Sequence, residues 1–259
     1  MCRIAAFIGP PLTLGELVCE PPHGLAHQSW AAKEMVSATV NADGWGAAWF
    51  DEARRPATYR QILPIWADVN LDALARSLRC DVWLANVRSA TAGLGTDYAN
   101  TQPFHNDRGG DDALLFTHNG FIDRFAHTLR ARVRAALDPE IEITINGNTD
   151  SEYLFALIRQ QRGPLAERVR TALALVREWL ADAPDVRALL NVIVSDGRQL
   201  VATRDALHGD APSLYYHHDW HGGIAIGSEA FDDQHGWAAV ESGEIIIAEA
   251  GKTPVRDSL

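Results

Sequence analysis

The chain begins Met1-Cys2-Arg3-Ile4-Ala5-Ala6-Phe7-Ile8-Gly9-Pro10-Pro11, and this stretch decides how the rest is interpreted. Residues 2–8 are mostly apolar, which predicts a strand that ends at Gly-Pro-Pro. Removal of Met1 would give Cys2 a free α-amine. Unperturbed α-amines have a pKa of about 7.7–8.0 and free thiols one of about 8.5, so this amine can deprotonate the adjacent thiol. Cys2 then supplies both nucleophile and base, or else it simply begins a buried strand.

The composition is that of an ordinary globular protein. Its 259 residues are 47% hydrophobic and 22% charged, enough for one large domain or two small ones. A net charge of −11 argues against nucleic acid as a partner, because phosphates bind clustered Lys and Arg. No apolar run approaches the roughly 20 residues of a membrane span, and the N-terminal run is too short for a signal peptide. We therefore expect a cytoplasmic protein with no membrane partner.

Strand patterns and helix patterns occur in separate blocks. Strands are predicted at residues 2–8, 46–51, 57–62, 82–88 and 113–117, the last ending at His118-Asn119-Gly120, with a short helix at 71–78. The strands at 46–51 and 57–62 could pair as a hairpin around Arg54-Arg55-Pro56. Helices are predicted at residues 121–137 and 165–180 and after Thr149-Asp150-Ser151-Glu152. Strands return at residues 189–195, 199–203, 223–227 and 244–248. This order predicts a layered α+β domain rather than alternating βαβ units.

Four further residues could serve acyl transfer. Asn119 and Gly120 can offer a side-chain and a backbone N–H to a developing oxyanion. In a substrate that carries a carboxylate and an ammonium, Arg88 could bind the carboxylate and Asp150 the ammonium. Each residue also has an ordinary explanation, since Asn-Gly is a common turn, Arg88 could form a surface ion pair and Asp150 could cap a helix.

Six motifs together resemble those of class II glutamine amidotransferases. They are Met1-Cys2-Arg3, Asn41-Ala42-Asp43-Gly44-Trp45-Gly46, Arg88-Ser89-Ala90-Thr91, Pro103-Phe104, His118-Asn119-Gly120 and Asn148-Thr149-Asp150-Ser151-Glu152. The resemblance implies an α+β, four-layer αββα sandwich of the N-terminal-nucleophile hydrolase type, with residues 1–259 as one domain.

The same resemblance assigns roles to residues. It implies that Cys2 is the nucleophile, that Asn119 and Gly120 form the oxyanion hole, and that Arg88 and Asp150 hold the glutamyl carboxylate and ammonium. These assignments agree with the chemistry that the residue types allow.

Two positions beside Arg88 extend this comparison. Thr91 matches a threonine that contacts the substrate. Ala92 stands where many members have histidine, so one carboxylate contact of the family is in question. The pocket around the substrate can therefore differ from that of a plain glutaminase.

A narrower resemblance points to one branch of the family. Pro21-Pro22-His23-Gly24-Leu25, Gln28-Ser29-Trp30, Pro64-Ile65-Trp66 and Ser228-Glu229-Ala230-Phe231-Asp232-Asp233 resemble the ergothioneine-biosynthesis branch. This implies hydrolysis of the small molecule γ-glutamyl-hercynylcysteine S-oxide. Two alternatives stay open: a glutaminase subunit that supplies ammonia to a separate synthase, and a non-catalytic γ-glutamyl-binding module.

No metal and no cofactor is expected. His217, His218 and His221 lie close together in the sequence, and His23 and His27 are four residues apart, but a zinc site needs three or four convergent ligands. We interpret these histidines as surface or loop residues. The leaving group is left open, as is the choice between a homo-oligomer and a synthase partner.

Overall fold

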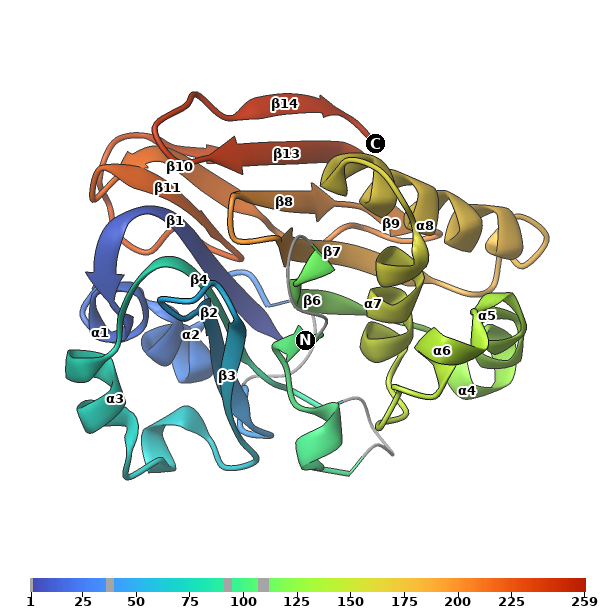
Figure 1. Ribbon diagram of the computed structural model, residues 1–259, viewed down its shortest axis with the longest axis horizontal. Coiled ribbons are helices and arrows are strands. Elements are labelled where there is room, and N and C mark those ends of the chain that lie inside the picture. The colour runs from blue at the N-terminus through green and yellow to red at the C-terminus, as the bar shows by residue number, and fades with distance from the viewer. Residues whose placement is uncertain (1, 36–39, 91–94, 107–111) are drawn as a thin grey trace.

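Two antiparallel sheets lie face to face, with helices on both outer sides (Figure 1). The computed structural model describes residues 2–35, 40–90, 95–106 and 112–259. One group of helices covers the first sheet and a second group covers the other sheet (Figure 1). The predicted α+β fold with four αββα layers is confirmed.

The first sheet carries the N-terminal strand near its centre. Its order is β12 (Trp237–Ala239), β10 (Tyr215–Trp220), β11 (Gly223–Gly227), β1 (Arg3–Thr13), β4 (Arg79–Val87), β2 (Trp45–Phe50) and β3 (Pro56–Gln61). The covering helices are α1 (Leu14–Val18), α2 (Leu25–Ala31) and α3 (Leu71–Ser77), with a 3-10 turn, η1 (Ile65–Ala67), beside them.

The second sheet packs against the longer helices. Its order is β14 (Val255–Ser258), β13 (Glu244–Glu249), β8 (Gln199–Arg204), β7 (Ala188–Ser195), β6 (Leu115–Ile122) and β5 (Phe104–His105), while β9 (Ala206–Leu207) also pairs with β7. Its helices are α4 (Phe125–Thr128), α5 (Arg130–Ala136), α6 (Pro139–Glu142), α7 (Asp150–Gln160) and α8 (Leu165–Leu180). A second 3-10 turn, η2 (Tyr98–Asn100), precedes β5.

β1 is buried on both faces, which explains its continuous apolar sequence. Ile4 and Ile8 point into the apolar layer between the sheets. Ala5 and Phe7 point into the layer beneath α1 and α2. Side chains alternate along a strand, so both layers meet at β1 and orient the chain that begins at Cys2.

Elements with strong local signals form as predicted. The helix predicted at residues 165–180 is α8, and Thr149 caps α7 by accepting a hydrogen bond from Glu152 N. The hairpin predicted around Arg54 is β2 paired with β3, and Arg54 adopts the left-handed conformation in its turn. The predicted strands at 82–88, 189–195, 199–203, 223–227 and 244–248 correspond to β4, β7, β8, β11 and β13.

Three predicted boundaries are wrong. β1 continues through Pro10 and Pro11 to Thr13, because β11 pairs only with Ala5 to Ile8 and so requires no N–H from either proline. β6 runs through Asn119 and Gly120 to Ile122, paired with β7, so Asn-Gly is not a turn here. The helix predicted from residue 121 therefore begins only at α4.

In the part of the chain that the structure describes, no helix combines the length and apolarity that crossing a bilayer requires.

The apolar layer between the sheets should dominate stability. Leu84 on β4 is fully buried in this layer, whereas Leu63 is 48% exposed. We expect Leu84→Ala to lower the free energy of unfolding by about 2–5 kcal/mol because it leaves a cavity. Leu63→Ala, the same chemical change, should stay within about 0.5 kcal/mol of wild type. Urea unfolding measures both, and equal losses would contradict this assignment of the core.

Candidate active site

Cys2 and Arg88 lie side by side at the ends of two neighbouring strands. Arg3 pairs with Val87, so the next position of the antiparallel register sets Cys2 beside Arg88. The Cys2 Sγ lies 3.9 Å from the Ser89 carbonyl oxygen. Cys2 is 8% exposed and Arg88 is 4% exposed. The predicted nucleophile and the predicted carboxylate ligand therefore share one end of the first sheet.

The segment before β2 fixes Arg88. Arg88 N donates to the Gly44 carbonyl at 2.8 Å, and Asp43 N donates to the Arg88 carbonyl at 3.0 Å. The Arg88 guanidinium donates to the Asp43 carbonyl at 3.2 Å, and the Asp43 carboxylate accepts from Ala90 N at 2.7 Å. These contacts explain why the Asn41 to Gly46 motif accompanies Arg88 in the sequence.

The Gly120 N–H points away from β7. Gly120 is opposite Leu190, and the Leu190 N–H donates to the Asp205 carbonyl at 2.8 Å on the far side of β7. Opposed residues in an antiparallel pair exchange both hydrogen bonds or neither, so this pair exchanges neither. The Gly120 N–H is consequently directed at the other edge of β6.

That edge is lined with N–H groups whose partners are polar side chains. His118 N donates to Gln102 Oε1 at 2.6 Å, and Ile122 N donates to Asp150 Oδ2 at 2.6 Å. The Gly120 N–H lies between them with the same direction, because residues two apart on a strand share orientation. A negatively charged oxygen could be bound here, next to the Asp150 carboxylate that would bind an ammonium.

The Asn119 side chain leaves the plane of the second sheet and points toward the first sheet. It is fully buried, and its Nδ2 donates to Ser228 Oγ at 3.3 Å. Ser228 Oγ also accepts from Ile4 N at 3.0 Å, two residues after Cys2. Among the described residues, Asn119 Oδ1 has no hydrogen-bond partner. The side-chain amide is thus connected to β1, the strand that follows Cys2, through one hydroxyl group.

His118 supports the start of α7 from beneath. Its Nε2 lies 2.8 Å from the Leu189 carbonyl oxygen, which can only accept, so Nε2 carries the proton. Its Nδ1 then accepts from the Ser151 hydroxyl at 2.9 Å. Complete burial lowers the pKa of His118, and the opposing effects of Asp150 and the Leu189 carbonyl are smaller. Burial thus disfavours the protonated form of His118, and the ring contacts the start of α7 through Ser151, the residue after Asp150.

The structure describes the positions of five of the six predicted site residues. Cys2 and Arg88 meet at the first sheet, while Asn119, Gly120 and Asp150 are gathered along the facing strand β6 and the start of α7. Thr91 lies outside the described residues. Sequence reasoning missed the supporting roles of Gln102, His118, Ser151 and Ser228. The one feature of the sequence that could have identified them is that they lie within or beside the motifs.

Two of the histidines interpreted as surface or loop residues are buried. His23 is 6% exposed, and its Nε2 lies 2.6 Å from Glu229 Oε2. His217 is 5% exposed, on β10. The sequence alone does not show these positions, because partners distant in the sequence enclose both rings. Within the described ranges, no three His, Cys, Asp or Glu side chains are arranged to bind a metal ion.

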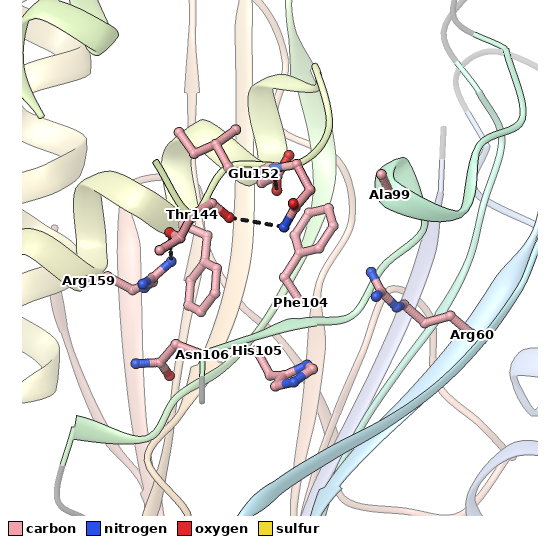
Figure 2. Close-up of a pocket in the computed structure, with 11 residues that line it drawn as sticks. Arg60, Ala99, Phe104, His105, Asn106, Thr144, Glu152 and Arg159 are labelled. Atoms are coloured by element: carbon pink, nitrogen blue, oxygen red, sulfur yellow. Dashed lines mark hydrogen bonds between the residues drawn. The ribbon is translucent and has the colours of Figure 1, made fainter. Parts of the chain in front are cut away.

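A cavity of about 480 Å³ opens beside this site, between β3, β5 and α7. Arg60 and Arg159 enter it from opposite sides (Figure 2). The Arg60 guanidinium donates to the Thr101 carbonyl at 3.0 Å, next to the Gln102 that binds His118. None of the five described site residues lines this cavity. The cavity is therefore a neighbour of the site and not part of it.

Comparisons with known proteins identify relatives. The model of the family "Glutamine amidotransferases class-II" matches residues 17–216. A γ-glutamyl-hercynylcysteine sulfoxide hydrolase from Mycolicibacterium smegmatis is 31% identical over 246 residues, 95% of each chain. The protein of that name from Mycobacterium tuberculosis strain CDC 1551 is 30% identical, over 98% of this chain and 95% of its own.

Solved structures share the fold. A glutamine aminotransferase class-II domain protein from Silicibacter pomeroyi superposes with a TM-score of 0.72 and 25% identity, covering 100% of this chain and 99% of its own. The glutamine phosphoribosylpyrophosphate amidotransferase from B. subtilis has a TM-score of 0.70 and 16% identity, over 99% of this chain and 49% of its own. The second likeness concerns the fold alone.

Gly120 should tolerate no side chain. A Cβ there would overlap the Leu189 carbonyl oxygen, which is backbone and cannot move aside. We expect Gly120→Ala to lower the free energy of unfolding by about 3 kcal/mol, the upper end of the usual cost of overpacking, and to abolish activity. Gly95→Ala is the matched control, because a Cβ at Gly95 meets nothing within 4 Å. Thermal unfolding of the two variants measures the difference. A Gly120→Ala protein that is as stable as Gly95→Ala would contradict the close contact between Gly120 and Leu189.

Proposed function

We propose, because this chain belongs to the class II glutamine amidotransferase family, that it is an enzyme that hydrolyses a γ-glutamyl amide bond. The observation that carries the proposal is the similarity over 95% of both chains to the γ-glutamyl-hercynylcysteine sulfoxide hydrolase of M. smegmatis. The neighbourhood of Cys2 and Arg88 supports it, since a nucleophile and a carboxylate ligand are both needed at one glutamyl group.

The first half of the proposed reaction forms a thioester. With Met1 removed, the α-amine of Cys2 takes the thiol proton and Sγ attacks the γ-carbonyl carbon. The tetrahedral oxyanion accepts hydrogen bonds from Asn119 Nδ2 and Gly120 N. The C–N bond then breaks, and the leaving amine takes the proton from the α-ammonium.

The second half releases glutamate. A water molecule attacks the thioester carbonyl, the same α-amine accepts its proton, and the same two donors stabilise the second oxyanion. The C–S bond breaks, the sulfur regains its proton from the α-ammonium and glutamate leaves. Arg88 holds the α-carboxylate and Asp150 the α-ammonium during both halves, with Thr91 as a further substrate contact.

The substrate we propose is γ-glutamyl-hercynylcysteine S-oxide, an intermediate of ergothioneine biosynthesis. The support is the name shared by the two mycobacterial relatives, each matched over nearly its whole length. We further propose that residues 1–259 act as one domain, because both sheets bury one common apolar layer. The location we propose is the cytoplasm. No cofactor enters the proposed steps, and the oligomeric state stays open.

Cys2 should be the residue that becomes acylated. Incubation with a γ-glutamyl chloromethyl ketone and intact-mass measurement should show one adduct, on a chain lacking Met1. Cys2→Ala should form no adduct and lose activity by at least about 10⁴-fold, since the nucleophile is gone. Cys19→Ala, which changes an exposed cysteine outside the site, is the control. An active protein that retains Met1 would refute the proposed base.

The leaving group should matter for turnover. We expect kcat/KM for the hercynylcysteine S-oxide conjugate to exceed that for glutamine by at least about 10²-fold, because a larger leaving group offers more contacts in the transition state. Steady-state release of glutamate from each substrate measures this ratio. A preference for glutamine would instead favour a glutaminase that supplies ammonia to a synthase.

A further inference from the structure

Ser228 and Glu229 directly follow β11 and lie against the beginning of β1. Ala5 pairs with Gly227, and Ser228 N donates to the Ile4 carbonyl at 2.9 Å. Ser228 is fully buried and Glu229 is 2% exposed. Ser228 and Glu229 therefore contact β1 at Ile4 and Arg3, the two residues that follow Cys2.

The Ser228 hydroxyl connects the two halves of the site. Its Oγ accepts from Ile4 N at 3.0 Å in the first sheet and from Asn119 Nδ2 at 3.3 Å in the second. The amide of Asn119 can rotate about its terminal torsion unless a partner holds it. In the structure Asn119 Nδ2 donates to Ser228 Oγ, and this hydrogen bond holds the amide next to Ile4, two residues after Cys2.

Glu229 anchors the segment that carries Ser228. Its carboxylate accepts from Arg3 at 3.3 Å, from the His23 ring at 2.6 Å, and from Lys33 N and Glu34 N at 2.9 Å each. Burial would raise the pKa of Glu229, but these contacts together outweigh it, so the carboxylate stays ionised. Arg3, fully buried, thereby has a counter-charge one residue from Cys2.

We propose that Ser228 is a positioning residue for hydrolysis, acting through Asn119, and that Glu229 holds it in place. This rests on the proposed function, in which Asn119 donates to the oxyanion. Because the oxyanion is absent from the bound substrate and develops only on the way to the tetrahedral intermediate, loss of the Ser228 acceptor reduces kcat and leaves ground-state binding of the glutamyl group unchanged.

The test is a double-mutant cycle on the full chain. Ser228→Ala should lower kcat about 10-fold or more, less than the 10²–10³-fold typical for losing an oxyanion donor outright. The inhibition constant of glutamate should change less than about 2-fold, since Arg88 and Asp150 are untouched. In the Asn119→Ala background, Ser228→Ala should change kcat less than about 2-fold, because the residue through which it acts is already gone.

Ser195→Ala is the matched control. Ser195 is equally buried, donates to the Gln199 carbonyl at 2.8 Å and accepts from Gly197 N at 3.0 Å, at the far end of β7. It should lose comparable thermal stability and keep wild-type kcat. If Ser228→Ala does not fold, Ser228→Cys replaces it, because sulfur keeps the volume and is a weaker acceptor.

Glu229→Gln tests whether the Glu229 carboxylate holds Ser228 in place. Glu244→Gln is the control, because Glu244 forms an ion pair with Arg256 away from the site. Glu229→Gln should lower kcat more than Glu244→Gln does. Equal kcat for the Ser228 and Ser195 variants, or an additive cycle with Asn119→Ala, overturns the positioning role. If instead the wild-type chain forms no Cys2 adduct with the γ-glutamyl chloromethyl ketone, the proposed function itself fails, whatever the variants do.

Discussion

The direction of hydrogen bonding along β6 is the constraint on which the site depends. One set of its N–H groups pairs with β7, and the alternate set serves Gln102 and Asp150, with the Gly120 N–H between them. A slip of one residue against β7 would turn that N–H inward and point Asn119 at the helices. The apolar layer between the sheets contains the hydroxyl contacts of Thr117 and Ser228, and polar pairs there favour a single register.

The sequence predicts the elements whose signals are local. The apolar period of α8, the Thr149 cap of α7 and the turn at Arg54 are each contained within a few residues, and all three form as predicted. The ends of β1 and β6 are different, because pairing partners far along the chain decide them. Residues that favour turns remain extended where a neighbouring strand binds them, as Asn119-Gly120 does opposite β7.

The candidate site likewise has features that the sequence predicts and features that it does not. The position of Cys2 after the initiator and the position of Arg88 at the end of a strand can be recognised without coordinates, and the register then brings the two together. The meeting of Glu229 with Arg3 and His23 cannot be predicted from composition or periodicity, because more than 200 residues separate the partners. The order of the motifs indicates that these segments contribute to the site. The contacts between the segments appear only in the three-dimensional structure.

The burial of β1 also bears on the time available for removal of Met1, a step that the proposed base requires. β11, which encloses β1 on one side, is synthesised more than 200 residues later. At about 5–20 residues per second, roughly ten to forty-five seconds pass between the two. An aminopeptidase that acts on the nascent chain has this interval before β11 covers β1. Because the proposed reaction requires a free α-amine on Cys2, recombinant protein meant for thiol chemistry should carry its affinity tag at the C-terminus.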